Sequence, residues 1–308
     1  MNEPKRHHWW PQLQSRHWTN SAGCICATRA DGTSFAANPS KIGVESELYV
    51  RFGTNGEKDF EIEKWFSRDI ETPFAQALDD FTSTQSLRRE RFLPDADKAK
   101  LIEQLGYLVV PYRESVAMSP KVRDVVSNYV AALLVRNPSY LAKMTQFHMK
   151  ENFTTPLAQV NTMSLDNMLI VFQQYRNVIE QSEFILVRRE GDHEFLFSDA
   201  GITTQEPWRT GPIPFDIHFP LTPDLALEVL PVPKPQTLDR IHIMRAKNSG
   251  VGRLNRIALG SAQRFIFSRK TLPPAYVRKF FGVSAPKPYG FRLVNGRLET
   301  KYDATRDD

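Results

Sequence analysis

Apolar residues recur at spacings of three and four over a long central part of the chain, which is typical of amphipathic helices. The clearest run covers residues 60 to 84, and Pro73 is expected to kink or split that helix. A second helix is predicted between Ser119-Pro120, an N-cap followed by proline, and Arg136. With further helical runs, the last opening at Ser164, the pattern predicts an almost wholly helical block from about residue 60 to 181. The apolar positions of the first run are Ile62, Trp65, Phe66, Ile70, Phe74, Ala77, Leu78 and Phe81.

Short extended runs lie on both sides of this block. Cys24 to Thr28 and Thr33 to Ala37 are joined by Asp31-Gly32, a pair suited to a tight turn, and this predicts a β-hairpin. After residue 181 the period changes, and Glu183 to Arg189 is predicted to pair with Glu194 to Phe197 as a second hairpin. Further strands are predicted at Phe215 to Phe219, Leu225 to Leu230, Ile241 to Met244 and Arg264 to Ser268, with a helix at Val251 to Ala262.

Runs of strands and runs of helices, without regular alternation, predict an α+β fold. A hairpin alone is not a stable sheet. We therefore expect the N-terminal hairpin to join the C-terminal strands in one mostly antiparallel sheet, with the helical block inserted between them. The predicted organisation is a single domain over residues 1–286, with a helical insertion at 57–181, and a partly disordered tail at 287–308.

Composition narrows the class of protein. Of the 308 residues, 41% are hydrophobic and 24% charged, which is close to globular averages and allows a sizeable core. No long apolar run predicts a membrane span, and the opening residues, charged and aromatic, predict no secretory signal peptide. Cys24 and Cys26 are two residues apart on a predicted strand, which separates their Cβ atoms too widely for a disulfide, so we expect free thiols and a cytoplasmic location. A net charge of +5 is compatible with a polyanionic partner but does not require one.

The stretch from Lys5 to Trp18 concentrates unusual side chains. It contains three of the seven histidines and three of the five tryptophans of the chain. One interpretation is a site in which a histidine acts as a general base or contacts a ligand. The other is structural, with one imidazole making a buried hydrogen bond and the tryptophans packing in the core. Metal-ligand spacing is absent from this stretch, so no metal site is predicted.

Other polar residues are candidates because of where they lie. Ser198-Asp199 follows a predicted strand, so the aspartate could orient a histidine, bind a ligand or cap a turn. Arg136, near a helix end, could contact a ligand or satisfy helix-end carbonyls. Among the carboxylates of the first half, most are explained by solvation of the surface. The candidates there are Glu45, Glu47, Glu63 and Glu71.

The order of several short motifs resembles the family called domain of unknown function 4238. Its members open with a histidine pair followed by two residues and proline. They continue with a hairpin and with the other short motifs given at the end of this paragraph. The resemblance spans about residues 5 to 270 and implies a fold and a set of polar motifs, without an activity. One departure is Ala200-Gly201, where asparagine-proline is usual, and Leu101 to Lys121 resembles an extra helix. The matching positions are His7-His8-Trp9-Trp10-Pro11-Gln12, Asp31-Gly32, Asn38-Pro39, Glu45 to Tyr49, Arg136-Asn137-Pro138, Ser198-Asp199, Pro220-Leu221, Asn255, Ala262 and Phe265 to Ser268.

Two functions are compatible with these observations. The first is a hydrolase-like enzyme with a polar site at a sheet edge, in which His8 is the general base, Asp199 its orienting partner and Glu45 a second acid. The second is a binding module without chemistry, which recognises nucleic acid or a protein through the aromatic and basic opening stretch. No cofactor and no definite partner is predicted, and no membrane contact is expected. The further candidates for ligand binding are His7, Gln12, Ser198, Asn255 and Arg136.

Overall fold

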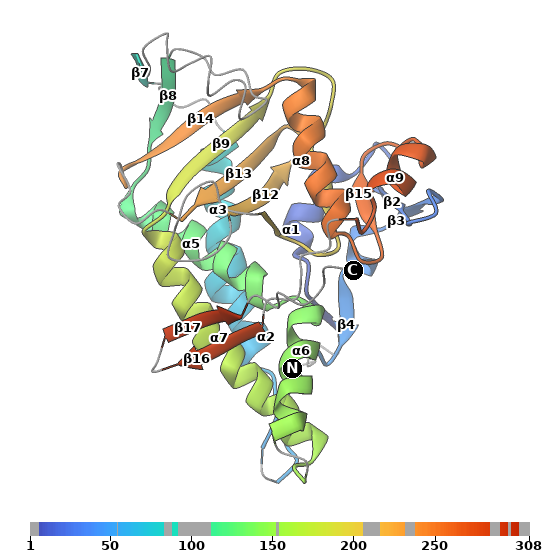
Figure 1. The fold of residues 1–308 in the computed structure, drawn as a ribbon, viewed down its shortest axis with the longest axis vertical. Helices are drawn as coiled ribbons and strands as arrows, with labels where there is room; N and C mark the ends of the chain where they lie inside the picture. The colour runs from blue at the N-terminus through green and yellow to red at the C-terminus, as the bar shows by residue number, and fades with distance from the viewer. Residues whose placement is uncertain are drawn as a thin grey trace.

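The chain folds into helices and mostly antiparallel sheets without a regular alternation of strand and helix, which confirms the α+β class (Figure 1). The computed structural model describes residues 6–53, 55–82, 88–91, 112–151, 154–205, 216–231, 238–283, 290–294 and 297–301.

The larger sheet has seven strands in the order β11-β12-β13-β9-β14-β8-β7. Neighbouring strands are antiparallel except β9 and β14, which run parallel. Their bounds are β11 Thr203–Gln205, β12 Asp216–Thr222, β13 Leu225–Leu230, β9 Glu183–Arg189, β14 Arg240–Ala246, β8 Tyr112–Ala117 and β7 Arg88–Arg91.

A second, four-stranded sheet has the order β10-β15-β2-β3. It contains the predicted N-terminal hairpin, because β2 pairs antiparallel with β3 and also with the C-terminal strand β15. The hairpin therefore joins C-terminal strands as expected, but the remaining C-terminal strands form a separate sheet. The bounds are β10 Phe197–Ser198, β15 Ile266–Ser268, β2 Ile25–Thr28 and β3 Ser34–Ala37, and three further pairs are β1 Arg6–His8 with β4 Val44–Ser46, β5 Arg51–Phe52 with β6 Lys58–Asp59, and β16 Gly290–Val294 with β17 Arg297–Lys301.

Most of the predicted helical block is helical. However, β7 and β8 lie inside it, so the expectation of helix almost throughout residues 60–181 was wrong there. Pairing of β8 with β14 is a long-range contact that local periodicity does not contain. The predicted helix over Leu101 to Val109 lies outside the described residues. The helices are α1 Gln12–Ser15, η1 Arg16–Trp18, η2 Pro39–Lys41, α2 Glu61–Trp65, η3 Phe66–Glu71, α3 Thr72–Thr82, α5 Pro120–Val135, α6 Pro138–Glu151, α7 Leu157–Glu180, α8 Asn248–Ser261 and α9 Pro274–Phe280.

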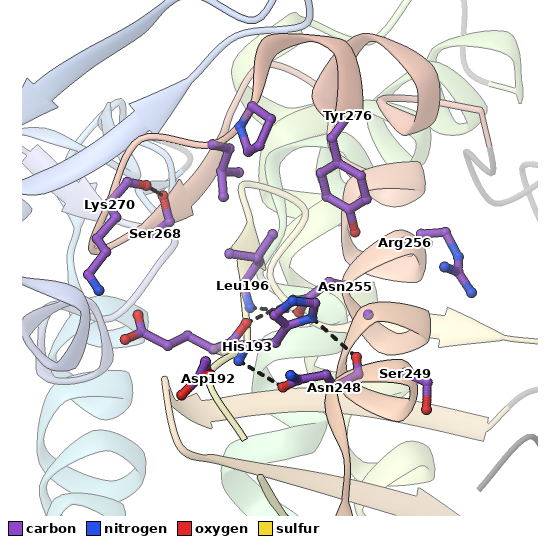
Figure 2. A pocket seen from close by; sticks show the side chains of 14 residues that line it. Asp192, His193, Leu196, Asn248, Ser249, Asn255, Arg256, Ser268, Lys270 and Tyr276 are labelled. Carbon is purple, nitrogen blue, oxygen red and sulfur yellow. Dashed lines mark hydrogen bonds between the residues drawn. The ribbon is translucent and has the colours of Figure 1, made fainter. Parts of the chain in front are cut away.

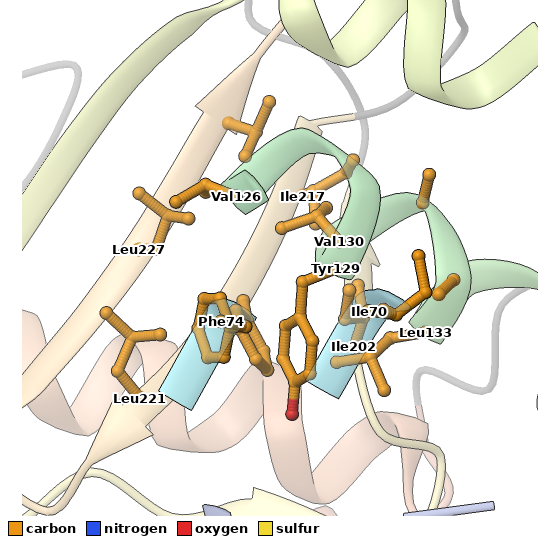
Figure 3. Close-up of a cluster of buried hydrophobic side chains, with 14 of the residues drawn as sticks. Ile70, Phe74, Val126, Tyr129, Val130, Leu133, Ile202, Ile217, Leu221 and Leu227 are labelled. Carbon is orange, nitrogen blue, oxygen red and sulfur yellow. The ribbon is translucent and has the colours of Figure 1, made fainter. Parts of the chain in front are cut away.

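The large sheet lies between two helical layers. On one face, the rings of Phe74 on α3 and Tyr129 on α5 stack with centroids 3.6 Å apart (Figure 3). Phe219 of β12 packs against Tyr129. On the other face, Leu254 of α8 packs over Ala226 of β13. Strands covered on both faces are buried at every position, as β12 is, and therefore lose the simple alternation of a surface strand.

The opening stretch is part of the core rather than a free end. Trp10 stacks on Phe197 with ring centroids 4.8 Å apart, and the indole N–H of Trp18 donates to the Phe195 carbonyl at 2.8 Å. Both tryptophans are fully buried. The structural interpretation of these tryptophans is therefore confirmed, and the N-terminal segment fastens to the strand region around residue 197.

Two local predictions need correction or a limit. Glu183 to Arg189 does form β9, but this strand pairs with β13 and β14, so the predicted hairpin with residues 194–197 was wrong. The short return strand β10 pairs instead with β15. In the predicted tail, β16 and β17 form a hairpin, and the other residues after 287 lie outside the described part.

Candidate functional site

His7 is held inside the protein by the backbone around it. Its side chain is fully buried, and Nδ1 accepts a hydrogen bond from the backbone N–H of Tyr49 at 2.9 Å. The imidazole also stacks on the Tyr49 ring, with centroids 5.7 Å apart. These contacts match the structural role foreseen for one imidazole of the pair.

His8 lies at the end of β1, and its side chain is half-buried and contacts Gln12. Its Nε2 lies 2.7 Å from Nε2 of Gln12, one helical turn further along the chain. An amide nitrogen can only donate, so Nε2 of His8 accepts and the proton of the neutral imidazole sits on Nδ1. The two predicted residues are thus brought together, and Gln12 fixes both the tautomer and the ring orientation of His8.

Arg136 ties the N-terminal segment to the helical block. It follows α5, and its side chain is only 1% exposed. One Nη1 N–H donates to Glu71 at 2.6 Å, and Nη2 donates to the His8 carbonyl. Burial lowers the pKa of the guanidinium, but Tyr49 and Glu71 raise it by more, so the pKa lies above its ordinary value and the side chain stays charged. We call Arg136, Glu63, Glu71, His8 and Gln12 the Arg136 centre.

Glu63 is the unusual carboxylate of this centre. Desolvation by burial raises its pKa to about 7, against the lowering effect of Arg136, while Glu71 raises it further. The backbone N–H of His8 donates to the carboxylate and lowers the pKa slightly. Its Oε2 is buried and has no hydrogen-bond partner within the described residues. Glu63 therefore changes protonation near neutral pH with one oxygen uncommitted.

A π-helical segment sets the relative position of Glu63 and Glu71. In a regular α-helix, residues eight positions apart differ in direction by about 80°. The segment η3 replaces part of that helix with wider turns, which reduces the rotation per residue and brings the two carboxylates towards one face. The hydroxyl of Thr72 donates to the Ser67 carbonyl at 2.9 Å across this segment. Pro73 follows at once, so the predicted disruption of the helix takes this form.

Asp199 belongs to a different network. Its two carboxylate oxygens accept from the backbone N–H groups of Gln263 and Arg264 at 2.8 and 2.7 Å, which fastens the end of β10 to the turn after α8. Desolvation raises the pKa of Asp199 above its ordinary value, although these backbone donors oppose the shift. Ser198 is fully buried, with Oγ 3.3 Å from Oγ of Ser261. Asp199 thus caps the backbone of this turn, which is one of the roles that the sequence left open for it.

Asn255 and Glu45 lie apart from the Arg136 centre. Asn255 accepts from the Leu196 N–H at 2.9 Å and donates to the Glu194 carbonyl at 2.8 Å, so it clamps α8 to the chain before β10. Glu45 is exposed on β4, opposite His7 in the strand register. It lines a cleft of about 260 Å³ together with Asn161. Of the predicted site residues, His8 contacts both Gln12 and Arg136, and Tyr49 links His7 to Arg136. Glu45 lies opposite His7 on the neighbouring strand, and the hydrogen bonds of Asp199, Ser198 and Asn255 belong to other networks.

Sequence reasoning included Glu63 among several carboxylates but did not single it out. The signal that distinguishes it is burial next to Arg136, which depends on the packing of η3, the continuation of α2, against α5 and has no local pattern. Within the ranges that the structure describes, no three histidine, cysteine or carboxylate side chains are grouped to hold a metal ion. None of the described helices combines the length and the apolar character that crossing a membrane requires.

Comparison with known proteins gave one match, to a family model. The model of a family described as "Protein of unknown function (DUF4238)" matches residues 6–271. That range includes the Arg136 centre and both larger sheets. A search of curated proteins and a search of solved structures each gave no match.

Proposed function

Because this chain belongs to the DUF4238 family, whose description assigns no activity, we propose its function from the Arg136 centre: a hydrolase that works by general acid–base catalysis. Glu63 is the proton-transfer group, and it takes the role of general base that was predicted from the sequence for His8. As a carboxylate, it removes a proton from water while the water oxygen bonds to the electrophilic atom of the substrate. It then returns that proton to the leaving group.

The observation that carries the proposal is the state of Glu63. A general acid–base group works best when its pKa lies near the working pH, and burial brings the pKa of Glu63 to about 7. Its uncommitted Oε2 is available for a proton. Carboxyl groups with shifted pKa values are common at functional sites because an acid–base catalyst needs a pKa matched to the working pH.

Other members of the centre have supporting roles. Nitrogen donors of Arg136 are engaged by Glu71 and by the His8 carbonyl, so Arg136 is a positioning residue that also keeps the pKa of Glu63 from rising further. His8, with its proton on Nδ1, is the second proton-bearing group beside Glu63. Gln12 holds the imidazole in place.

The binding-module alternative loses its main support. Stacking of bases requires exposed aromatic faces, but Trp10 and Trp18 are buried and Trp9 is partly buried against the core. Cys24 and Cys26 are free thiols, which supports a cytoplasmic location as part of the proposal.

Substitution of Glu63→Gln tests the proposal, with Glu61→Gln on the same helix as the matched control. Glu61 is exposed and pairs with Lys64 at 2.6 Å, so its loss leaves the centre intact. The purified protein is assayed on chromogenic carboxylate esters, phosphate mono- and diesters and glycosides from pH 5 to 9. We expect activity that rises with pH through about 7, falls by at least about a hundredfold in Glu63→Gln and persists in Glu61→Gln.

Carboxyl carbon NMR of Glu63 gives a second readout that needs no substrate. A titration midpoint close to 7, absent in Glu63→Gln, is expected. An ordinary midpoint for Glu63, equal activity in the two variants, or no turnover of any substrate in the panel would contradict the proposed function.

A further inference from the structure

A cleft of about 540 Å³ lies beside α8, away from the Arg136 centre. Three segments that are far apart in sequence form its walls: residues 192–196 before β10, the first half of α8, and residues 268–276 between β15 and α9. In Figure 2, Tyr276 and His193 lie on opposite sides of the space, with Lys270 and Arg256 towards its two flanks. The volume falls within the range of roughly 300 to 1,000 Å³ that small-molecule sites occupy.

One part of the wall is apolar. Leu196, Leu272, Pro273 and the ring of Tyr276 line it. Burial raises the pKa of the Tyr276 hydroxyl, which reflects the low polarity around this ring. A ligand that fills this part gains by burying an apolar body of its own, such as an aromatic ring or a branched chain.

The cations of the cleft are not neutralised by the protein. Arg256 and Lys270 are exposed side chains, and neither forms an ion pair within the described part of the chain. By contrast, the Glu194 carboxylate is neutralised by Arg269 through two hydrogen bonds of 3.0 and 2.6 Å. Asp192, exposed at the lip, is the remaining opposing charge. The cleft therefore presents an excess of positive charge to a ligand.

Asn248 fixes the position of His193, which can provide a further polar contact to a ligand in the cleft. Its backbone N–H donates to Oδ1 of Asn248 at 3.1 Å, and its Nδ1 lies 3.2 Å from the Asn248 carbonyl. Only a protonated Nδ1 can bond a carbonyl oxygen, so Nε2 is the nitrogen left for a ligand. It accepts a hydrogen bond when the ring is neutral and donates one when the ring is charged.

We propose that this cleft binds a small amphipathic organic anion, whose apolar body lies against Leu196, Leu272 and Tyr276 and whose carboxylate or phosphate group is attracted by the positive charge that Arg256 and Lys270 give to the two flanks. Guanidinium and ammonium groups are the side chains that proteins use for such head groups. None of these residues belongs to the Arg136 centre, so a result that contradicts the binding site would not contradict the hydrolase proposal, and the reverse also holds.

Three naphthalene compounds separate the contributions of charge and shape. 1-Naphthoate and 1-naphthyl phosphate carry the two candidate head groups on the same ring, and 1-naphthol is uncharged at neutral pH. Binding is measured by isothermal titration calorimetry on the full chain at low salt. We expect both anions to bind at least about tenfold more tightly than 1-naphthol, which corresponds to about 1.4 kcal/mol. The tighter of the two identifies the preferred head group.

The double variant Arg256→Gln/Lys270→Gln is compared with Lys247→Gln/Arg264→Gln, which removes two exposed cations before and after the same helix. Circular dichroism confirms that both variants are folded. We expect the first variant to lose the preference for anions and the second to keep it. Equal binding of 1-naphthol and the anions, equal affinities in both double variants, or no binding of either anion would overturn the proposal.

Discussion

Two pairs of titratable side chains, each with at least one fully buried member, lie on opposite faces of the large sheet and are bonded in different ways. Arg136 and Glu71, on the helical-block side, are 2.6 Å apart, and further donors of Arg136 reach backbone and hydroxyl oxygens. His218 and Glu228, opposite one another on β12 and β13, are 3.8 Å apart. Neither ring nitrogen of His218 nor Oε1 of Glu228 has a hydrogen-bond partner within the described residues.

The difference shows that hydrogen bonding, more than burial, decides the charge state. The guanidinium of Arg136 is as buried as His218, but it remains charged because oxygen atoms surround it. Desolvation lowers the pKa of His218 to about 3 and raises that of Glu228 to about 7, so at pH 7 His218 is uncharged and Glu228 is about half protonated. For Glu228, the charge of Arg253 opposes the shift and that of Asp216 adds to it.

The largest expected effect comes from breaking the bonded pair. Arg136→Met leaves Glu71 and the His8 carbonyl without their donor, and we expect a loss of about 3–5 kcal/mol in the free energy of unfolding. Arg176→Met is the matched control, because Arg176 pairs with Asp124 at the same 2.6 Å but near the surface. The loss in the free energy of unfolding caused by Arg176→Met should stay below about 1 kcal/mol. Urea denaturation at pH 7 measures both, and equal losses would remove the contrast between the buried and the surface pair.

The unbonded pair predicts a pH effect of opposite sign for its two members. The raised pKa of Glu228 means that the folded protein holds more protons than the unfolded chain between about pH 4.5 and 7, so stability falls as pH rises through that window. The lowered pKa of His218 means that its contribution is complete above about 6.5 and is lost as pH falls towards 3. Between about 4.5 and 6.5 the two slopes oppose one another.

Glu228→Gln isolates one slope, because the amide has a similar shape and no charge. The free energy of unfolding of the variant minus that of the wild type should increase as the pH is raised from 4 to 8, by on the order of 3 kcal/mol, because the variant lacks the loss that ionisation of Glu228 causes. Urea denaturation at several pH values gives the comparison. A difference between the two proteins that does not change with pH would show that Glu228 ionises normally in the folded state.

Parts of this arrangement follow from sequence and parts do not. The N-terminal hairpin was predictable because Asp31-Gly32 fixes its turn, and the helices because their apolar spacing is strong. The parallel pairing of β9 with β14 and the pairing of β8 with β14 were not, because register between distant strands leaves no local pattern. The importance of Glu63 depends on Arg136, which only the folded helical block brings next to it.

The smallest test asks whether the contrast between bonded and unbonded groups also holds for uncharged hydroxyls. Tyr49 donates to the Arg136 carbonyl at 2.7 Å, whereas the buried hydroxyl of Tyr140 has no partner within the described residues. Tyr49→Phe should therefore cost about 1 kcal/mol, because it leaves a buried carbonyl oxygen without that donor. Tyr140→Phe should cost less than about 0.5 kcal/mol or stabilise, because it removes a desolvated hydroxyl that gains nothing by folding. Urea denaturation of the two single variants measures both changes, and an equal loss in both would mean that the Tyr140 hydroxyl is hydrogen-bonded in solution.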